Sequence, residues 1–197
     1  MFTGIITDLG EVRSIKRGGD TRFEFTTGYD TAAIAIGASI CCSGVCMTVI
    51  DKEQGWFAVS ASAETLSKST MGSWKEGSAV NFERSLKAGD EMGGHIVSGH
   101  VDGVARLAAV SPDGDSLRMA FSAPEDLKRF IATKGSLAID GVSMTVNDVH
   151  GGRFAINVIP HTRDATTLGR LKEGDAVNVE IDMLARYVAR LLEFEKD

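Results

Sequence analysis

The sequence predicts an all-β protein made of two copies of one compact unit, followed by a C-terminal helix. Three observations predict this: the second half repeats the first at a spacing of 97 residues, the segments are short and rich in β-branched and aromatic residues, and the end has a helical pattern without a counterpart. A unit of roughly 90 residues with five or six short strands must protect its sheet edges, and closure into a small barrel is the usual way. We therefore expect two small barrels in tandem.

The repeat is clearest in its central and closing parts. Gly44–Val49 aligns with Gly141–Val146, and the register continues without a gap to Glu83 and Glu180, with 19 of 40 positions identical. The openings are looser, and residues 2–6 correspond only approximately to residues 98–101. The stretch Lys87–Asp90 reads as a turn or linker. We predict a first barrel over residues 1–90, a second over 91–183 and a helix over 184–197.

Strand segments with period-two alternation, separated by glycine-containing turns, recur in each copy. In the first copy we expect strands at Arg22–Thr26, Val45–Ile50, Trp56–Ser60 and Ala79–Glu83. Short helical segments are expected near residues 30–36, 65–71, 123–130 and 162–168.

The last segment has a helical spacing of apolar residues. The stripe consists of Leu184, Tyr187, Val188, Leu191 and Leu192. Two interpretations stay open: the helix packs back on its own barrel, or the stripe joins copies of the chain.

Composition excludes several classes of function. The net charge is −6, and no run of Lys and Arg is present, so nucleic acid is not an expected partner. No apolar stretch is long enough to span a membrane, and the residues Met1–Gly4 do not open a signal peptide. A cytoplasmic protein without membrane contact is expected.

The three cysteines, Cys41, Cys42 and Cys46, lie within six residues of each other. Neighbouring cysteines are poorly placed to form a disulfide, and this spacing lacks the paired Cys or His pattern of a zinc site. We expect neither a disulfide framework nor a bound metal.

Duplication predicts two similar pockets, so the informative positions are those where the copies differ in chemistry. The differing pairs are Cys46 and Ser143, Ile5 and His100, Glu64 and His161, and Gly37 and Lys134. Each residue also has an ordinary structural interpretation: Cys46 as a buried apolar residue, and His95 and His100 as loop histidines. These residues alone indicate a small-molecule binder or an enzyme with two related but unequal pockets.

Several motifs together closely resemble the riboflavin synthase family of the alpha-chain type. They are the opening Met1–Ile6, Gly44–Val49, Asp90–His100, Gly141–Val146 and Thr166–Gly169. The resemblance runs over the whole chain in order. It implies two tandem six-stranded Greek-key antiparallel β-barrels and a C-terminal α-helix that assembles a homotrimer.

The resemblance also implies a reaction. Two molecules of 6,7-dimethyl-8-ribityllumazine react, and a four-carbon unit moves from one to the other, giving riboflavin and 5-amino-6-ribitylaminouracil. No cofactor or metal is needed. A reaction of two identical molecules needs two similar pockets, and unequal pockets can separate donor from acceptor.

By similarity, the residues nearest the chemistry are Cys46, Thr48, His100, Ser143 and Thr145, and the resemblance leaves open which is base and which nucleophile. One lumazine is expected to contact Gly4, Ile5, Ile6 and Met47, together with Ser60, Ala61, Ser62, Ala63, Glu64 and Thr65. The other is expected to contact Gly99, Val101, Lys134 and Met144, together with Ile159, Pro160, His161, Thr162, Arg163 and Asp164. In the family, the two lumazines meet between the first barrel of one subunit and the second barrel of a neighbour.

Two alternatives remain at this point. Lumazine proteins of the same superfamily bind a lumazine or flavin without turning it over, and they tend to lose residues of the second pocket; Ser143, Thr145, His100 and Lys134 are all present here. A flavin domain of a reductase would need a nicotinamide-binding half, which the sequence lacks.

Overall fold

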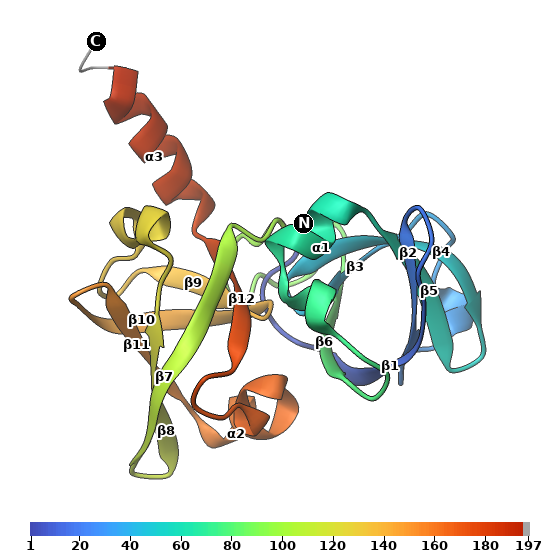
Figure 1. Cartoon of the computed structure of the whole chain (residues 1–197), viewed down its shortest axis with the longest axis horizontal. Coiled ribbons are helices and arrows are strands. Elements are labelled where there is room, and N and C mark those ends of the chain that lie inside the picture. Colours follow the sequence, from blue (N-terminus) through green and yellow to red (C-terminus); the bar gives the residue numbers. More distant parts are fainter. Residues whose placement is uncertain (195–197) are drawn as a thin grey trace.

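The alternating segments form two closed antiparallel β-barrels of six strands each in the computed structural model, which describes residues 1–194 (Figure 1). The first barrel consists of β1 (Asp8–Lys16), β2 (Thr21–Thr26), β3 (Ser39–Cys42), β4 (Val45–Glu53), β5 (Trp56–Ala61) and β6 (Ala79–Arg84). The second consists of β7 (Gly103–Asp113), β8 (Ser116–Ser122), β9 (Ser136–Ile139), β10 (Val142–His150), β11 (Arg153–Val158) and β12 (Ala176–Ile181). The predicted fold class is confirmed.

Both barrels share one Greek-key order. Around the first, the strands follow β1-β2-β5-β4-β3-β6, and the second has the corresponding order with β7 to β12. Register shifts occur at matching places, at Val12 and Val49 in the first barrel and at Leu107 and Val146 in the second. Such bulges add the bending that a small barrel needs in order to close.

Each barrel has its own apolar core, since alternate strand residues point inward. The first core is aromatic, with Phe25, Phe57 and Phe82 in mutual ring contact at centroid distances of 5.2 to 5.5 Å. The second is mainly aliphatic around the stacked Phe121 and Phe154. The edge-to-face contacts of Phe82 with Phe25 and Phe57 add to the gain from burial.

Short helical pieces connect the strands. They are α1 (Ala63–Lys68) and α2 (Pro160–Ala165), and the 3₁₀ turns η1 (Thr31–Ala33), η2 (Thr70–Ser73), η3 (Glu125–Phe130) and η4 (Thr167–Arg170). The segments expected at 65–71 and 162–168 are each interrupted. Ser69 and Thr166 adopt extended backbone angles there, and their hydroxyls cap the turn that follows.

The predicted C-terminal helix is α3 (Met183–Phe194), and the predicted positions 195–197 lie outside the described residues. It extends away from the second barrel (Figure 1). The five stripe residues are between 52% and 70% exposed. The helix therefore does not bury its stripe on its own barrel. None of the helices in the described part of the chain combines the length and apolarity needed to cross a membrane.

The barrels meet at two matching hairpin turns, Ser43–Gly44 and Asp140–Gly141, whose residues all have positive φ. A Cβ atom on Gly141 would lie 2.8 Å from the Gly44 nitrogen, so the close approach requires glycine. Asn81 and Asn178 extend the contact, because each donates its side-chain amide to the carbonyl of the opposite turn, at 2.9 and 2.8 Å.

Candidate functional site

Two extended segments precede the barrels and cross between them. We call residues 2–7 the first arm and residues 97–102 the second arm. They pair with each other, since the Phe2 N–H donates to the Val97 carbonyl at 2.8 Å and the Val97 N–H donates back at 3.0 Å. Phe2 and Val97 form a small core between the barrels together with Cys41 and Ala138.

Each arm then runs along the barrel of the other copy. The Cys46 N–H donates to the Gly99 carbonyl at 2.7 Å, and the Ser143 N–H donates to the Gly4 carbonyl at 2.8 Å. Correspondingly, Val101 packs against the first core and Ile6 against the second. The second arm therefore belongs spatially with Cys46, and the first arm with Ser143.

Glycine makes these contacts possible. Gly4 and Gly99 have φ values of +78° and +80°, and a Cβ at either position would lie 2.6 Å from the Cβ of Ser143 or Cys46 respectively. Atoms that close would force the arm away from the strand. The glycines thus place both arms directly against Ser143 and Cys46.

A buried carboxylate holds each arm. Glu180 accepts hydrogen bonds from the backbone of Ser98, Gly99 and His100 at 2.6 to 3.0 Å. Glu83 does the same for the first arm, accepting from Thr3 and Gly4. Burial raises the pKa of the Glu83 carboxyl, and the arm's donors partly oppose that rise. Each of the two carboxylates therefore holds the backbone of one arm in place.

The first half-site combines Cys46 and Thr48 of β4 with the second arm. Met47 and Val49 alternate with them and point into the core. Cys46 is half-buried and Thr48 exposed, as is His100 on the arm. A thiol, a hydroxyl and an imidazole thus lie on the outside of the first barrel. The expected residues that follow β5 form the start of α1, where the Ser62 hydroxyl caps the helix by accepting from Thr65 N–H at 3.2 Å.

The second half-site combines Ser143 and Thr145 of β10 with the first arm. The expected residues 159–164 form the start of α2, with Pro160 at its first turn. Lys134 has a φ of +66°, where its counterpart Gly37 has +86°, and both donate their N–H to the matching β-strand carbonyl. A non-glycine residue in this region is uncommon and often accompanies function.

His95 is the residue that the sequence interpretation left without a role. Its Nδ1 lies 2.7 Å from Ser143 Oγ, and its Nε2 is buried without a hydrogen-bond partner among the described residues. Burial lowers the pKa of the imidazole, which favours the neutral form. The sequence feature that could have pointed to His95 is the Gly93-Gly94 pair that precedes it. The chain passes so close to the first arm here that a Cβ on Gly94 would lie 2.0 Å from the Thr3 carbonyl oxygen.

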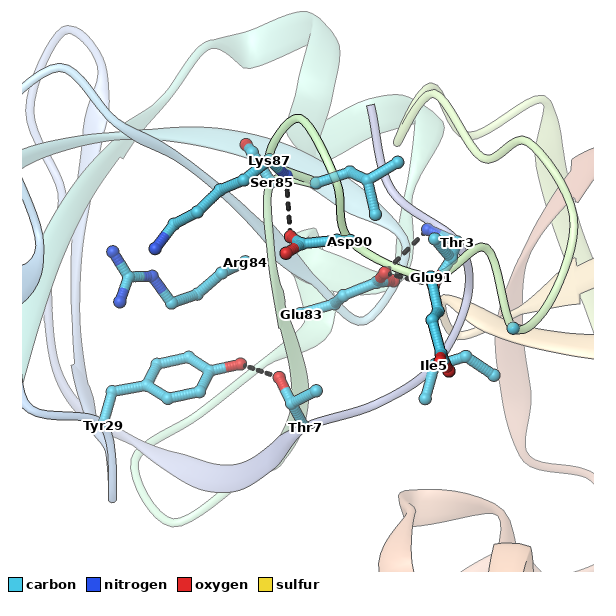
Figure 2. A pocket seen from close by; sticks show the side chains of 12 residues that line it. Thr3, Ile5, Thr7, Tyr29, Glu83, Arg84, Ser85, Lys87, Asp90 and Glu91 are labelled. Atoms are coloured by element: carbon cyan, nitrogen blue, oxygen red, sulfur yellow. Dashed lines mark hydrogen bonds between the residues drawn. The ribbon is translucent and has the colours of Figure 1, made fainter.

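Each arm also lines a cavity on its outer side. That of the first arm has a volume of about 490 Å³ and includes Thr3, Ile5 and Glu83. Figure 2 shows the hydrogen bond between the Tyr29 and Thr7 hydroxyls in this cavity, and the Glu83 carboxylate beside the backbone of the arm. The corresponding cavity of about 460 Å³ includes His100 and Val101 of the second arm. Within residues 1–194, no three His, Cys, Asp or Glu side chains gather as a metal set.

The arrangement differs from the expected one in how the residues group. The family resemblance grouped Gly4, Ile5 and Ile6 with Cys46, and Gly99, His100 and Val101 with Ser143, as contacts of one lumazine each. In the structure the first arm instead lies against Ser143 and the second arm against Cys46. The side chains of Met47 and Met144 lie in the barrel cores, and that of Ala61 is fully buried, so they support the outer face from behind.

Comparison with known proteins adds the family. The model of the lumazine binding domain matches residues 3–85 and again 98–182. The riboflavin synthase of Brucella abortus is 51% identical over an alignment that covers 100% of both chains. The chain belongs to the riboflavin synthase family. Other members include the riboflavin synthases of Photobacterium phosphoreum, at 40% identity over 100% of this chain and 91% of the relative, and of Mycobacterium tuberculosis, at 39% over 98% of each.

Solved structures confirm the fold. A crystal structure of LumP complexed with riboflavin superimposes with a TM-score of 0.85 at 24% identity, covering 92% of this chain and 99% of that one. LumP complexed with 6,7-dimethyl-8-(1'-D-ribityl) lumazine gives a TM-score of 0.83. The family match accounts for the duplication: each copy is one lumazine binding domain.

Proposed function

We propose that this protein is a riboflavin synthase, a transferase that converts two molecules of 6,7-dimethyl-8-ribityllumazine into riboflavin and 5-amino-6-ribitylaminouracil. The observation that carries the proposal is the 51% identity with the Brucella abortus riboflavin synthase over the full length of both chains. Both half-sites also keep reactive side chains, with Cys46 and His100 in one and Ser143 and Lys134 in the other. A protein that only binds a lumazine has no need of two such sets.

The unequal half-sites fit the two unequal roles in the reaction. Holding two ring systems face to face in a reactive geometry can contribute about 7–11 kcal/mol to lowering the barrier. Side chains then need only move protons and activate one ring. A neutral His95 can accept the Ser143 hydroxyl proton, which makes that oxygen, or a water beside it, a better nucleophile. The reaction needs no cofactor or metal.

The proposal includes a homotrimer in the cytoplasm, with sites between the first barrel of one subunit and the second barrel of a neighbour. The exposed stripe of α3 supports self-association, because contiguous apolar surface of this kind usually marks an interface. Cys46, Thr48 and Thr145 lie at the protein surface or half-buried, where a second subunit could cover them.

A single assay tests the activity. Purified protein is incubated with the ribityllumazine alone, and flavin formation is followed by absorbance.

We expect His95→Gln to lower kcat by about 10²-fold or more with little change in lumazine affinity. His150→Gln, at the exposed end of β10, is the matched control. Tight lumazine binding by folded wild-type protein without any flavin would instead identify a non-catalytic binding protein.

A further inference from the structure

The start of α3 forms one wall of the cavity that His100 lines. Met183, Arg186 and Tyr187 come from the helix, whereas His100 and Asp102 come from the second arm. The first copy has no helix in this place, and its cavity is instead completed by residues 84–93. The helix thus contacts the arm in one copy only, and that arm is the one that lies against Cys46.

Asp102 joins the arm to the helix. Its Oδ1 accepts a hydrogen bond from Arg186 at 2.7 Å, its Oδ2 accepts from the Ile181 N–H at 2.9 Å, and its own N–H donates to the Val179 carbonyl at 2.9 Å. The carboxylate is only 11% exposed. Arg186 is 43% exposed, so the contact is half-buried, and a charge-assisted hydrogen bond to a buried carboxylate restrains both partners more than a fully exposed pair does.

Several contacts therefore anchor the six residues of the second arm, and three of them surround His100. Gly99 is held by Cys46, the backbone from Ser98 to His100 is held by Glu180, and Asp102 is held by Arg186. His100 lies between the first and the last of these anchors. Without Arg186, Asp102 keeps its hydrogen bonds to Ile181 and Val179 but loses its link to α3, so the end of the arm that continues into β7 is held less tightly.

We propose that Arg186 is a positioning residue: through Asp102, helix α3 fixes the second arm against Cys46 and so sets the place of His100 within its own chain. The helix then has two separate tasks on two faces. Its apolar stripe contacts other copies, and Arg186 on the adjoining face completes the first half-site. The effect on catalysis rests on the proposed function, whereas the effect on the arm does not.

The experiment compares Arg186→Gln with Arg186→Lys and with Arg129→Gln. Arg129 pairs with Glu193 at 3.0 Å at the far end of the same helix, so its variant removes an ion pair of α3 without touching the arm. Arm position is read from the alkylation rate of Cys46 by iodoacetamide. Cys41 and Cys42 are buried, and burial raises their thiol pKa well above its usual range, so Cys46 dominates the signal.

We expect Arg186→Gln to raise the alkylation rate several-fold and to lower kcat by roughly 10- to 100-fold, the loss that a displacement of about 1 Å can cause, with KM changed much less. Arg186→Lys should restore most of both, and Arg129→Gln should resemble wild type. Equal rates for Arg186→Gln and Arg129→Gln would overturn the proposal.

A further variant separates the effect of lost assembly from the effect of the lost ion pair between Arg186 and Asp102. Leu191→Glu places a charge on the stripe and leaves Arg186 intact, so it measures how far dissociation alone, which uncovers Cys46 in the proposed assembly, raises the alkylation rate. If Arg186→Gln reacts no faster than Leu191→Glu, the ion pair does not hold the arm. Absence of flavin from the wild-type chain would contradict the proposed function alone, since the alkylation comparison would still decide on Arg186.

Discussion

Asp140 differs from Ser43, its counterpart in the first copy, by a carboxyl group buried between the barrels. Its Oδ1 accepts the Asn178 N–H at 2.8 Å, as Ser43 Oγ accepts the Asn81 N–H at 3.0 Å. Burial raises the pKa of the Asp140 carboxyl from 3.8 to about 7, with only that hydrogen bond opposing the rise. The second copy thus carries a carboxyl where a hydroxyl suffices.

This carboxyl predicts a dependence of stability on pH. Between pH 3.8 and about 7 the unfolded chain has lost the proton that the folded chain keeps, so a rise in pH through this window favours unfolding. Asp140→Ser should therefore be more stable than wild type at pH 8, by up to about 4 kcal/mol, and the difference should shrink toward pH 4. Urea denaturation at both pH values measures it. Asp113→Ser, at an exposed strand end, is the control, and a difference independent of pH would contradict the expectation.

At the scale of single elements, the second arm depends on Gly99. Alanine there meets both an unfavourable φ of +80° and the Cβ of Cys46 at 2.6 Å, whereas Gly55 has a φ of +81° with nothing within 4 Å. Gly55→Ala should cost about 1–2 kcal/mol from backbone strain alone. Gly99→Ala should cost more and should also abolish most flavin formation, because it displaces the arm. Denaturation and the flavin assay test the pair, and equal effects would show that the arm tolerates the displacement.

Helix α3 gives the second prediction at this scale. Leu191 is 68% exposed on the stripe, and Ile36 is a 58% exposed apolar residue of the first barrel, far along the chain from the helix. Leu191→Glu should dissociate the assembly, since a charge cannot be buried unpaired in an apolar interface. Ile36→Glu should leave it intact. Sedimentation velocity distinguishes the two, and an unchanged mass for Leu191→Glu would remove the stripe from the interface.

The strands and helices could be predicted from the sequence, whereas the crossing of each arm to the barrel of the other copy could not. Strand patterns at residues such as Trp56–Ser60 depend on local alternation, which each copy repeats. The contacts of Gly4 with Ser143 and of Gly99 with Cys46 depend on which copy an arm meets. Because the copies have the same pattern of turns and apolar residues, the sequence gives both pairings equal support. The backbone pairing of Phe2 with Val97 directs the arms across each other, and each arm then lies against the barrel of the other copy.

His95 escaped prediction for a related reason. Its glycine-rich segment has no periodicity, and the residue approaches Ser143 only once both barrels are folded. The positions that differ in chemistry between the copies, Cys46, His100 and Ser143, lie on or against the arms, and their roles in the reaction stay a prediction. The domain limits 1–90, 91–183 and 184–197 stay a prediction, and the crossed arms show that contacts do not follow such limits.

At the scale of the whole molecule, the proposed trimer predicts complementation between inactive chains. A site made of the first half-site of one subunit and the second half-site of a neighbour needs an intact Cys46 on one chain and an intact Ser143 on the other. Cys46→Ala and Ser143→Ala homotrimers should each be nearly inactive. Unfolded together in equal amounts and refolded, they should regain about one quarter of the wild-type sites, because each required half is present with a probability of about one half.

A site formed within one chain would behave differently. Every chain in the mixture carries one defect, so no chain would hold both intact half-sites, and refolding would restore nothing. Mixing the two variants without unfolding serves as the control, since subunits that do not exchange cannot complement. The measured fraction of recovered flavin formation thus decides whether the duplicated pockets pair within one chain or across the interface that we propose for α3.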